Sequence, residues 1–167
     1  MPWEERIVDF LLYRLLTRKV HAWFSPNSYA YRDRTFGLDR CQSRIAGILH
    51  SQHGPIYLIK RDITDYFASV DHEILLAKLQ RLMEGEDYLF HLLRQRVRFV
   101  FQDESGPRQA ERGIPFGTAI ACLFANIYLT GLDREIERIP EVHYFRYADD
   151  SAPRAQRTEE GPMCVTA

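Results

Sequence analysis

Two adjacent carboxylates, Asp149 and Asp150, follow a short apolar and aromatic run near the end of the chain. A third carboxylate, Asp62, closes a nearly continuous apolar run that starts at Ile56. If the two runs form neighbouring strands, the three acids meet at one edge of a sheet. Hard divalent cations such as Mg²⁺ take oxygen ligands of this kind. Two such ions, about 3.5 to 4 Å apart, can serve phosphoryl transfer.

A simpler interpretation makes the Asp-Asp pair a polar hairpin turn and Asp62 a cap, because aspartate is a favoured turn residue. Against it, a carboxylate at the end of a buried strand is costly unless it is paired or bound to a metal. The segments between the acids are needed to choose between the two interpretations.

The rest of the chain predicts helices that would cover the back of such a sheet. Apolar residues at helical spacing predict helices over residues 4–24, from 38 to the Gly54-Pro55 break, and over 72–83, 88–97 and 118–139. Strands are expected over 56–63 and 144–147, and a hairpin is expected to join 99–101 to 108–112.

With 167 residues, 46% of them hydrophobic, the chain can bury one core, as one large domain or as part of a bigger one. The net charge of -1 gives no sign of a nucleic-acid partner. Residues 14–61, however, hold nine Lys or Arg and only two acids. Such a basic segment could meet phosphates, or it could be an ordinary solvated face.

Three widely spaced cysteines, without a CxxC pair, support neither a zinc site nor a disulfide framework. Glu4 and Glu5 stand where a signal peptide would be basic, and no apolar run approaches the roughly 18 residues of a membrane span. We therefore expect a soluble, cytoplasmic protein with no membrane partner.

Four segments together resemble one family. Tyr147-Ala148-Asp149-Asp150 resembles the YxDD (here YADD) box of reverse transcriptases, and residues 62–72 are similar to the first palm motif of bacterial group II intron and retron-type enzymes. Residues 113–133 resemble the PQG box and the LANIYLxxLD helix of the same enzymes, and residues 29–32 are a looser match to their fingers motif. The shared order and spacing of four motifs make the resemblance specific.

The resemblance implies an α+β fold: the fingers and a partial palm of a right-hand polymerase in residues 1–150, with a small antiparallel sheet backed by helices and no thumb. It implies RNA-templated DNA synthesis by two-metal nucleotidyl transfer, in a retroelement or a defence system. The partners would be an RNA template, a DNA or RNA primer and deoxynucleotide triphosphates. Asp62, Asp149 and Asp150 would hold two Mg²⁺ ions, with Mn²⁺ as an alternative, and the backbone carbonyl of Ile63 would lie near a metal.

The same resemblance assigns substrate-binding residues. Phe67, five residues after Asp62, matches the steric gate that excludes a ribose 2′-hydroxyl, because a bulky ring leaves no room for that oxygen. Phe116 and Gly117 match the box that positions the templating base pair. Basic side chains that could neutralise triphosphate or template charge, a plain surface role being an equal alternative, are Arg32, Lys60 and Arg61.

Two departures from the family pattern keep alternatives open. Phe116 replaces the family's glutamine, so a template-free or RNA-synthesising polymerase stays open. After Asp150 no apolar strand, lysine-bearing segment or thumb follows, and we expect residues 151–167 to be a non-homologous, disordered tail of a form truncated just after the YADD motif. The missing strand would leave an open sheet edge that favours homo-oligomers. The alternative function is therefore an inactive nucleic-acid-binding or interaction fragment.

Overall fold

The computed structural model describes residues 3–33, 35–103, 105–115, 117–151 and 154–156. The chain forms two compact units, which we describe separately. The first, here called the helical unit, combines the start of the chain up to Trp23 with Asp65–Tyr128. The second, here called the strand unit, combines Phe24–Thr64 with the chain from Leu129 onward.

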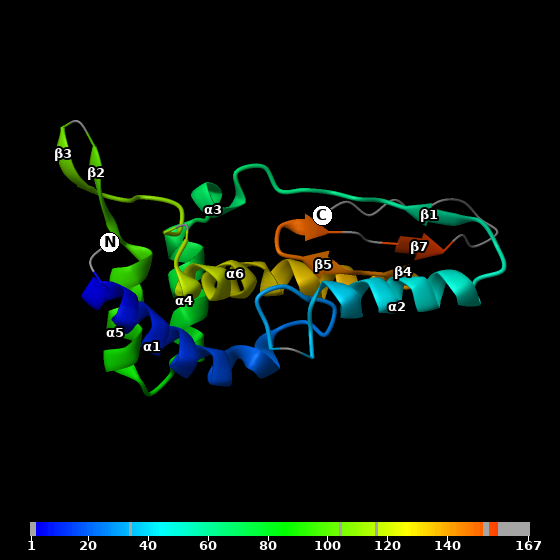
Figure 1. Ribbon diagram of the computed structural model, residues 1–167, viewed down its shortest axis with the longest axis horizontal. Helices are drawn as coiled ribbons and strands as arrows, with labels where there is room; N and C mark the ends of the chain where they lie inside the picture. The colour runs from blue at the N-terminus through cyan, green and yellow to red at the C-terminus, as the bar shows by residue number, and fades with distance from the viewer. Residues whose placement is uncertain (1–2, 34, 104, 116, 152–153, 157–167) are drawn as a thin grey trace. The chain divides into compact units, whose positions relative to one another are not determined.

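The helical unit has a core of packed helices (Figure 1). Leucine, valine and phenylalanine side chains of four of its helices are fully buried, among them Leu16, Leu79, Leu93, Val97 and Phe124. The elements are α1 (Trp3–Val20), the 3-10 turn η1 (His21–Trp23), α3 (Tyr66–Ser69), α4 (His72–Leu82), α5 (Asp87–Val97), β2 (Val100–Asp103), β3 (Gly106–Gln109) and the first part of α6 (Ala119–Glu137). The helices and the hairpin predicted for these segments are confirmed.

The loop after β3, residues 110–115, is fastened to the segment that contains Phe67. The amides of Gly113 and Ile114 donate to the carbonyls of Val70 and Phe67, each at 2.8 Å. The buried ring of His72 contacts the carbonyl of Gly113 at 2.6 Å through Nε2. Two of the motifs picked out by the resemblance are thus held together inside one unit.

Gly113 is required at its position for two reasons. Its φ is +84°, and a Cβ would lie 3.1 Å from the Phe67 carbonyl oxygen and 3.2 Å from Ala68 Cα. Gly85, in the same unit, has a similar φ of +80° and nothing within 4 Å.

We expect Gly113→Ala to destabilise the protein more than Gly85→Ala. A left-handed backbone costs an L-residue about 1 to 2 kcal/mol, and forced overpacking adds about 1 to 3 kcal/mol at Gly113 only. Urea unfolding of both variants measures the difference. Equal losses would show that the loop moves away from Phe67 without cost.

Asp71 caps the N-terminus of α4. Its carboxylate accepts hydrogen bonds from the amides of Glu73 and Ile74 at 3.0 and 3.2 Å. The amide of Ile74, then that of Glu73, and more weakly Arg112, hold the pKa of Asp71 below its ordinary value.

Because the pKa of Asp71 is lower in the folded than in the unfolded protein, its stabilisation is present above the ordinary aspartate pKa and is lost as the pH falls through the folded value. Asparagine caps helices as well as aspartate does and does not titrate. We therefore expect acidification from pH 7 to pH 2.5 to lower the melting temperature of the wild type more than that of Asp71→Asn. An equal fall in both proteins would contradict this role for Asp71.

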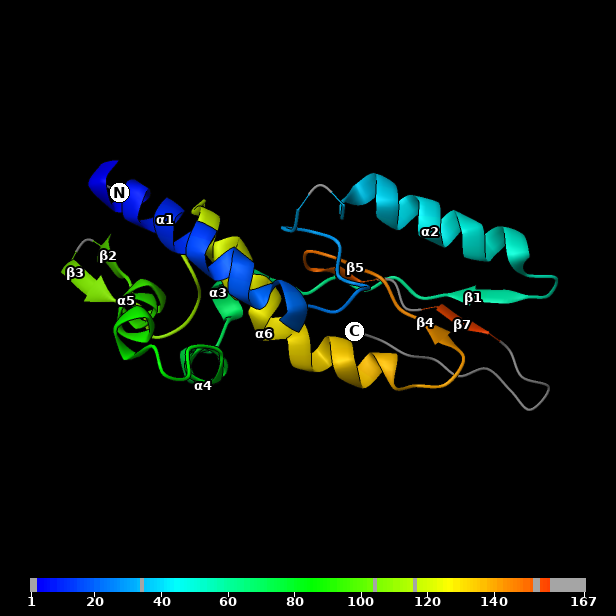
Figure 2. The same cartoon turned by 90° about the horizontal axis from the view of Figure 1, so that it is seen from below.

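The strand unit holds short antiparallel strands between two helices. Figure 2 shows β4, β5 and β7 with α2 on one side and the C-terminal part of α6 on the other. One sheet has the order β1-β7-β4, and β5 pairs with β6 in a separate hairpin. The bounds are α2 (Leu38–Ser51), β1 (Ile56–Leu58), β4 (Val142–His143), β5 (Arg146–Tyr147), β6 (Asp150–Ser151) and β7 (Arg154–Gln156). The predicted mixed fold, with a small antiparallel sheet backed by helices, is confirmed.

Three strand predictions need correction. The strand expected over 144–147 is formed only by Arg146–Tyr147. The buried strand expected over 56–63 is only three residues long, and Leu58 is 65% exposed. An apolar run does not reveal whether both faces of a strand are covered.

The prediction that no second strand follows Asp150 was also wrong. Asp150–Ser151 pairs with β5, and Arg154–Gln156 pairs with β1 and β4. Ladder hydrogen bonds come from the backbone and need no apolar side chains. That a non-homologous tail begins after residue 150 stays a prediction, because residues 152–153 and 157–167 lie outside the described part.

Of the three cysteines, Cys41 is buried and Cys122 half-buried, both unpaired, and Cys164 lies outside the described residues. Burial raises the pKa of both described thiols. In the described part of the chain, no helix has the length and apolar character that crossing a membrane requires.

Candidate active site

The Asp-Asp pair lies at the tip of the β5–β6 hairpin, as the sequence predicts. Tyr147 pairs with Asp150, so Ala148 and Asp149 form a two-residue turn. Ala148 has a φ of +60°, and a positive φ at the first central residue is typical of the primed turns that close tight hairpins. Asp149 is half-buried in this turn, and the backbone of Asp150 begins β6.

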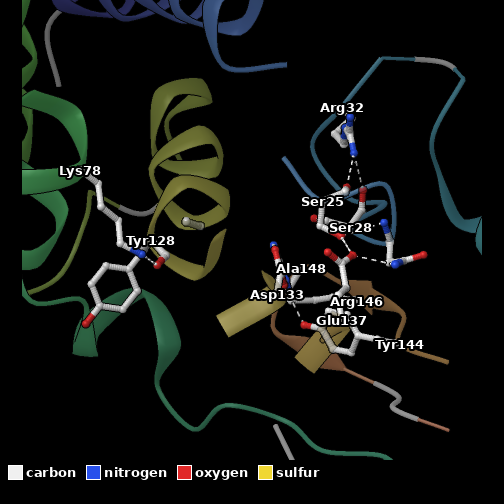
Figure 3. Close-up of polar contacts among 12 residues, drawn as sticks. Ser25, Ser28, Arg32, Lys78, Tyr128, Asp133, Glu137, Tyr144, Arg146 and Ala148 are labelled. Carbon is white, nitrogen blue, oxygen red and sulfur yellow. Dashed lines mark hydrogen bonds and ion pairs between the residues drawn. The ribbon is translucent and has the colours of Figure 1, made fainter. Parts of the chain in front are cut away.

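A buried ion pair lies directly under this hairpin (Figure 3). Arg146 of β5 donates from Nε and Nη2 to the two carboxylate oxygens of Asp133 on α6, each at 2.8 Å. The side chains of Arg146 and Asp133 are 1% and 0% exposed. A two-pronged bond of this kind fixes the orientation of both groups, because the guanidinium and the carboxylate are planar.

Tyr144 is the third member of the cluster. Its hydroxyl donates to Asp133 Oδ1 at 2.8 Å, and the ring is 2% exposed. Burial, together with the negative charge of Asp133, raises the pKa of Tyr144 far above its ordinary value. The raised pKa agrees with the role of the hydroxyl as a hydrogen-bond donor to Asp133.

The remaining donor group of Arg146 reaches the turn itself. Nη1 donates to the carbonyl of Ala148 at 2.9 Å, one residue before Asp149. The backbone of Arg146 is also fixed, since its amide donates to Asn27 at 2.8 Å and its carbonyl accepts from Tyr29 at 2.9 Å. Arg146 thus connects helix α6 to the turn that presents the carboxylates.

Glu137, a second carboxylate of α6, binds the segment around Asn27, to which the backbone of Arg146 is hydrogen-bonded. Glu137 accepts hydrogen bonds from Ser25 Oγ and, at 2.6 Å, from Asn27 Nδ2 (Figure 3). Helix α6 therefore anchors both the hairpin and the chain beside it.

The other predicted metal ligands lie in the same unit. Asp62 is exposed and Ile63 half-buried in the segment after β1. Aspartate and carbonyl oxygens suit hard divalent cations. Among the described side chains, which leave out that of Asp150, no three His, Cys, Asp or Glu groups gather closely enough to hold a metal ion. The donor atoms fit Mg²⁺ in chemistry, and their convergence stays a prediction.

The predicted phosphate-binding residues of the strand unit differ in their exposure and in their contacts. Lys60 and Arg61 are exposed. Arg32 is half-buried, donates to the carbonyls of Ser25 and Ser28 at 2.6 and 3.1 Å, and stacks 3.4 Å from the centre of the Phe36 ring. Burial lowers its pKa. In this conformation Arg32 organises the loop around it, and its contact with a phosphate stays a prediction.

The predicted nucleotide and template residues belong to the helical unit. Phe67 is half-buried in α3, with its ring edge-on to Tyr66 at a centroid distance of 5.7 Å. Gly117 is exposed and has a φ of +83°, and Phe116 lies outside the described residues.

Comparison with known proteins decides the family. The profile of the family described as "Reverse transcriptase (RNA-dependent DNA polymerase)" matches residues 6–166. The chain belongs to the reverse transcriptase family. An uncharacterized 91 kDa protein in a cob intron of Schizosaccharomyces pombe is 25% identical over 135 residues, which cover 81% of this chain and 16% of that protein.

Solved structures show the reverse transcriptase fold as well. Telomerase from Candida albicans, in complex with a TWJ fragment of telomeric RNA, has a TM-score of 0.67 at 11% identity and covers 90% of this chain and 30% of its own. The corresponding Candida tropicalis complex has a TM-score of 0.70 at 10% identity, covering 90% and 29%. This chain thus spans less than a third of the length of these proteins.

Sequence reasoning about this reverse transcriptase domain overlooked Arg146. It treated the residues around Arg146 as strand formers and read Asp133 only as part of a motif. One signal was available: Arg146 interrupts the aromatic run Tyr144–Tyr147, and Asp133 is the first charged residue of α6, after an uncharged run that starts at Ala119. Buried charges of opposite sign usually occur as partners.

Proposed function

We propose that the protein containing this chain synthesises DNA on an RNA template. The observation that supports this most is the hairpin turn that presents Asp149, held through its own backbone by a fully buried ion pair. A simple polar turn needs no such support, because its residues face water. Within the reverse transcriptase family, a rigid pair of carboxylates is what nucleotidyl transfer requires.

Asp62, Asp149 and Asp150 would hold divalent ions in this proposal, with the Ile63 carbonyl beside them. Bound Mg²⁺, or Mn²⁺ in its place, stabilises the attacking and leaving oxygens in a phosphoryl transfer. The chain's own part is to hold the carboxylates in place. Arg146 does this indirectly, because its bond to the Ala148 carbonyl restrains the peptide before Asp149.

The partners would be an RNA template, a DNA or RNA primer and deoxynucleotide triphosphates. The Candida telomerases solved with RNA support RNA as the template class. Arg32, Lys60 and Arg61 would neutralise phosphates, and Phe116 with Gly117 would face the templating pair. The cob intron protein favours an intron-type retroelement, with a retron or defence system as the alternative. Oligomerisation through an open sheet edge stays a prediction.

Primer extension tests the proposal. The full chain, with Mg²⁺, is given a labelled DNA primer on an RNA template, beside Asp62→Ala and a reaction without template. We expect template-dependent extension by the wild type only. RNA binding without extension by any protein would favour the alternative of a non-catalytic nucleic-acid-binding fragment, and extension without template would favour a template-independent polymerase.

Phe67 is proposed as the sugar gate. Phe67→Ala is expected to raise ribonucleotide incorporation relative to deoxynucleotide incorporation by about 10- to 100-fold, because the smaller side chain makes room for a hydroxyl. Tyr66→Phe, which keeps the ring and removes the 2.5 Å bond from the Tyr66 hydroxyl to the Ala125 carbonyl, is the control that should keep the wild-type preference. Unchanged sugar selectivity in Phe67→Ala would exclude Phe67 as the gate.

A further inference from the structure

A cavity of about 740 Å³ opens inside the helical unit, among α1, α5 and the β2–β3 hairpin. We call it the arginine cavity, because three arginines from one stretch of chain line it. The side chains that matter for its chemistry are Arg94, Arg96, Arg98, Phe99, Gln109 and Pro115.

The three arginines have different partners. Arg96 is held by Asp9 at 2.8 Å and by Glu5 at 3.7 Å, so its charge is largely met within the unit. Arg98 pairs at 2.5 Å with Glu73, whose side chain is 77% exposed. A solvent-exposed pair of this kind is weak and yields readily to another anion.

Arg94 differs from both neighbours. It is exposed on α5 and forms no ion pair with any residue in the described part of the chain. Arg94, which has no ion-pair partner among the described residues, and Arg98, which has a weak one, therefore line the same cavity. This arrangement favours an anionic ligand.

The hairpin beside the cavity adds aromatic surface. Phe99 and Phe101 lie 6.5 Å apart, centroid to centroid, and Phe101 is 44% exposed. Arg108 lies directly across from Phe101 on β3, where paired side chains share one face of the ribbon. Because the Phe101 side chain is this exposed, the aromatic face of the ribbon is available to a ligand.

We propose that the arginine cavity and the Phe101 face of the hairpin bind single-stranded RNA. Arginines meet phosphates, exposed rings stack on bases, and the amide of Gln109 offers hydrogen bonds to base edges. An acidic peptide would use the arginines and leave the aromatic face without a role. Pro115 lines the same cavity and is followed in the sequence by the proposed templating residues Phe116 and Gly117. That the bound strand leads toward these residues rests on the proposed function.

The test measures RNA binding by the full chain without catalysis. A fluorescent 12-nucleotide oligouridylate is titrated in EDTA at several salt concentrations, and the variants are the double substitution Arg94→Ala with Arg98→Ala, and Phe101→Ala. We expect the double variant to lower the salt dependence of log K by about one to two units. We expect Phe101→Ala to weaken binding by roughly 5- to 100-fold. Arg81→Ala, an exposed arginine of α4 in the same unit, is the matched control and should bind like the wild type.

Equal binding by the double variant, Arg81→Ala and the wild type would overturn the proposal. A polyglutamate peptide of the same length that competes fully with the RNA would overturn it in favour of an acidic protein partner. Thermal melts of each variant show that a loss of binding is not a loss of fold. The RNA-binding assay contains EDTA and therefore does not depend on the metal site. If Asp62→Ala loses primer extension but still binds RNA, RNA binding and catalysis are separate properties, and the two proposals can fail independently.

Discussion

Replacing Asp133 by alanine is expected to lower the free energy of unfolding by about 3 to 5 kcal/mol. The substitution leaves the guanidinium of Arg146 buried, at 1% exposure, without its counter-ion. It also leaves the Tyr144 hydroxyl without its acceptor. Urea unfolding followed by circular dichroism measures the loss, and Asp39→Ala, at an exposed carboxylate of the same unit, should change stability by less than about 0.5 kcal/mol.

A triple variant separates stability from positioning. Asp133→Leu, Tyr144→Phe and Arg146→Met together remove the buried polar groups, and apolar replacements of similar volume often restore or exceed wild-type stability. We expect stability to recover and primer extension to stay low, because the Ala148 carbonyl has lost its donor. Full recovery of extension in a stable triple variant would show that the Arg146 contact does not position the turn.

Asp149→Asn is expected to reduce primer extension by at least about 10²- to 10³-fold, because it weakens the hold on the metal ion that would stabilise the developing charge, and losing such electrostatic stabilisation typically costs this much. Asparagine is also a favoured turn residue, so the hairpin should keep its stability. Single-turnover extension on an RNA template measures the effect, and Asp39→Asn serves as the matched control for removing one exposed carboxylate. Wild-type extension by Asp149→Asn would remove Asp149 from the active site.

Local signals were enough to predict most of the helices. The α4 helix begins where Asp71 caps it, and α6 ends before Pro140, as the sequence indicates. The strands were harder, because their pairing depends on residues far apart in the chain. β7 joins β1 to β4, and neither its sequence nor its position predicted that role.

In the candidate site, too, some features follow from the local sequence and others depend on contacts between residues far apart in the chain. The positions of Asp149 and Asp150 follow from local turn chemistry, and the residues were recognisable by motif. The support from Asp133 was not predictable in this way, since Arg146 and Asp133 are 13 residues apart and meet only through the packing of β5 on α6. The convergence of Asp62 with the hairpin depends on tertiary structure too, and it is the point on which the proposed function depends most.

Binding of Mn²⁺ tests that convergence directly. Electron paramagnetic resonance measures the concentration of free Mn²⁺ as the ion is titrated into the full chain, Asp62→Asn and Asp149→Asn. If the carboxylates form one site, the wild type binds Mn²⁺, Mg²⁺ competes with it, and each single substitution weakens binding by at least about tenfold. Mn²⁺ binding that is equal in all three proteins would contradict a shared metal site made by Asp62 and the β5–β6 turn.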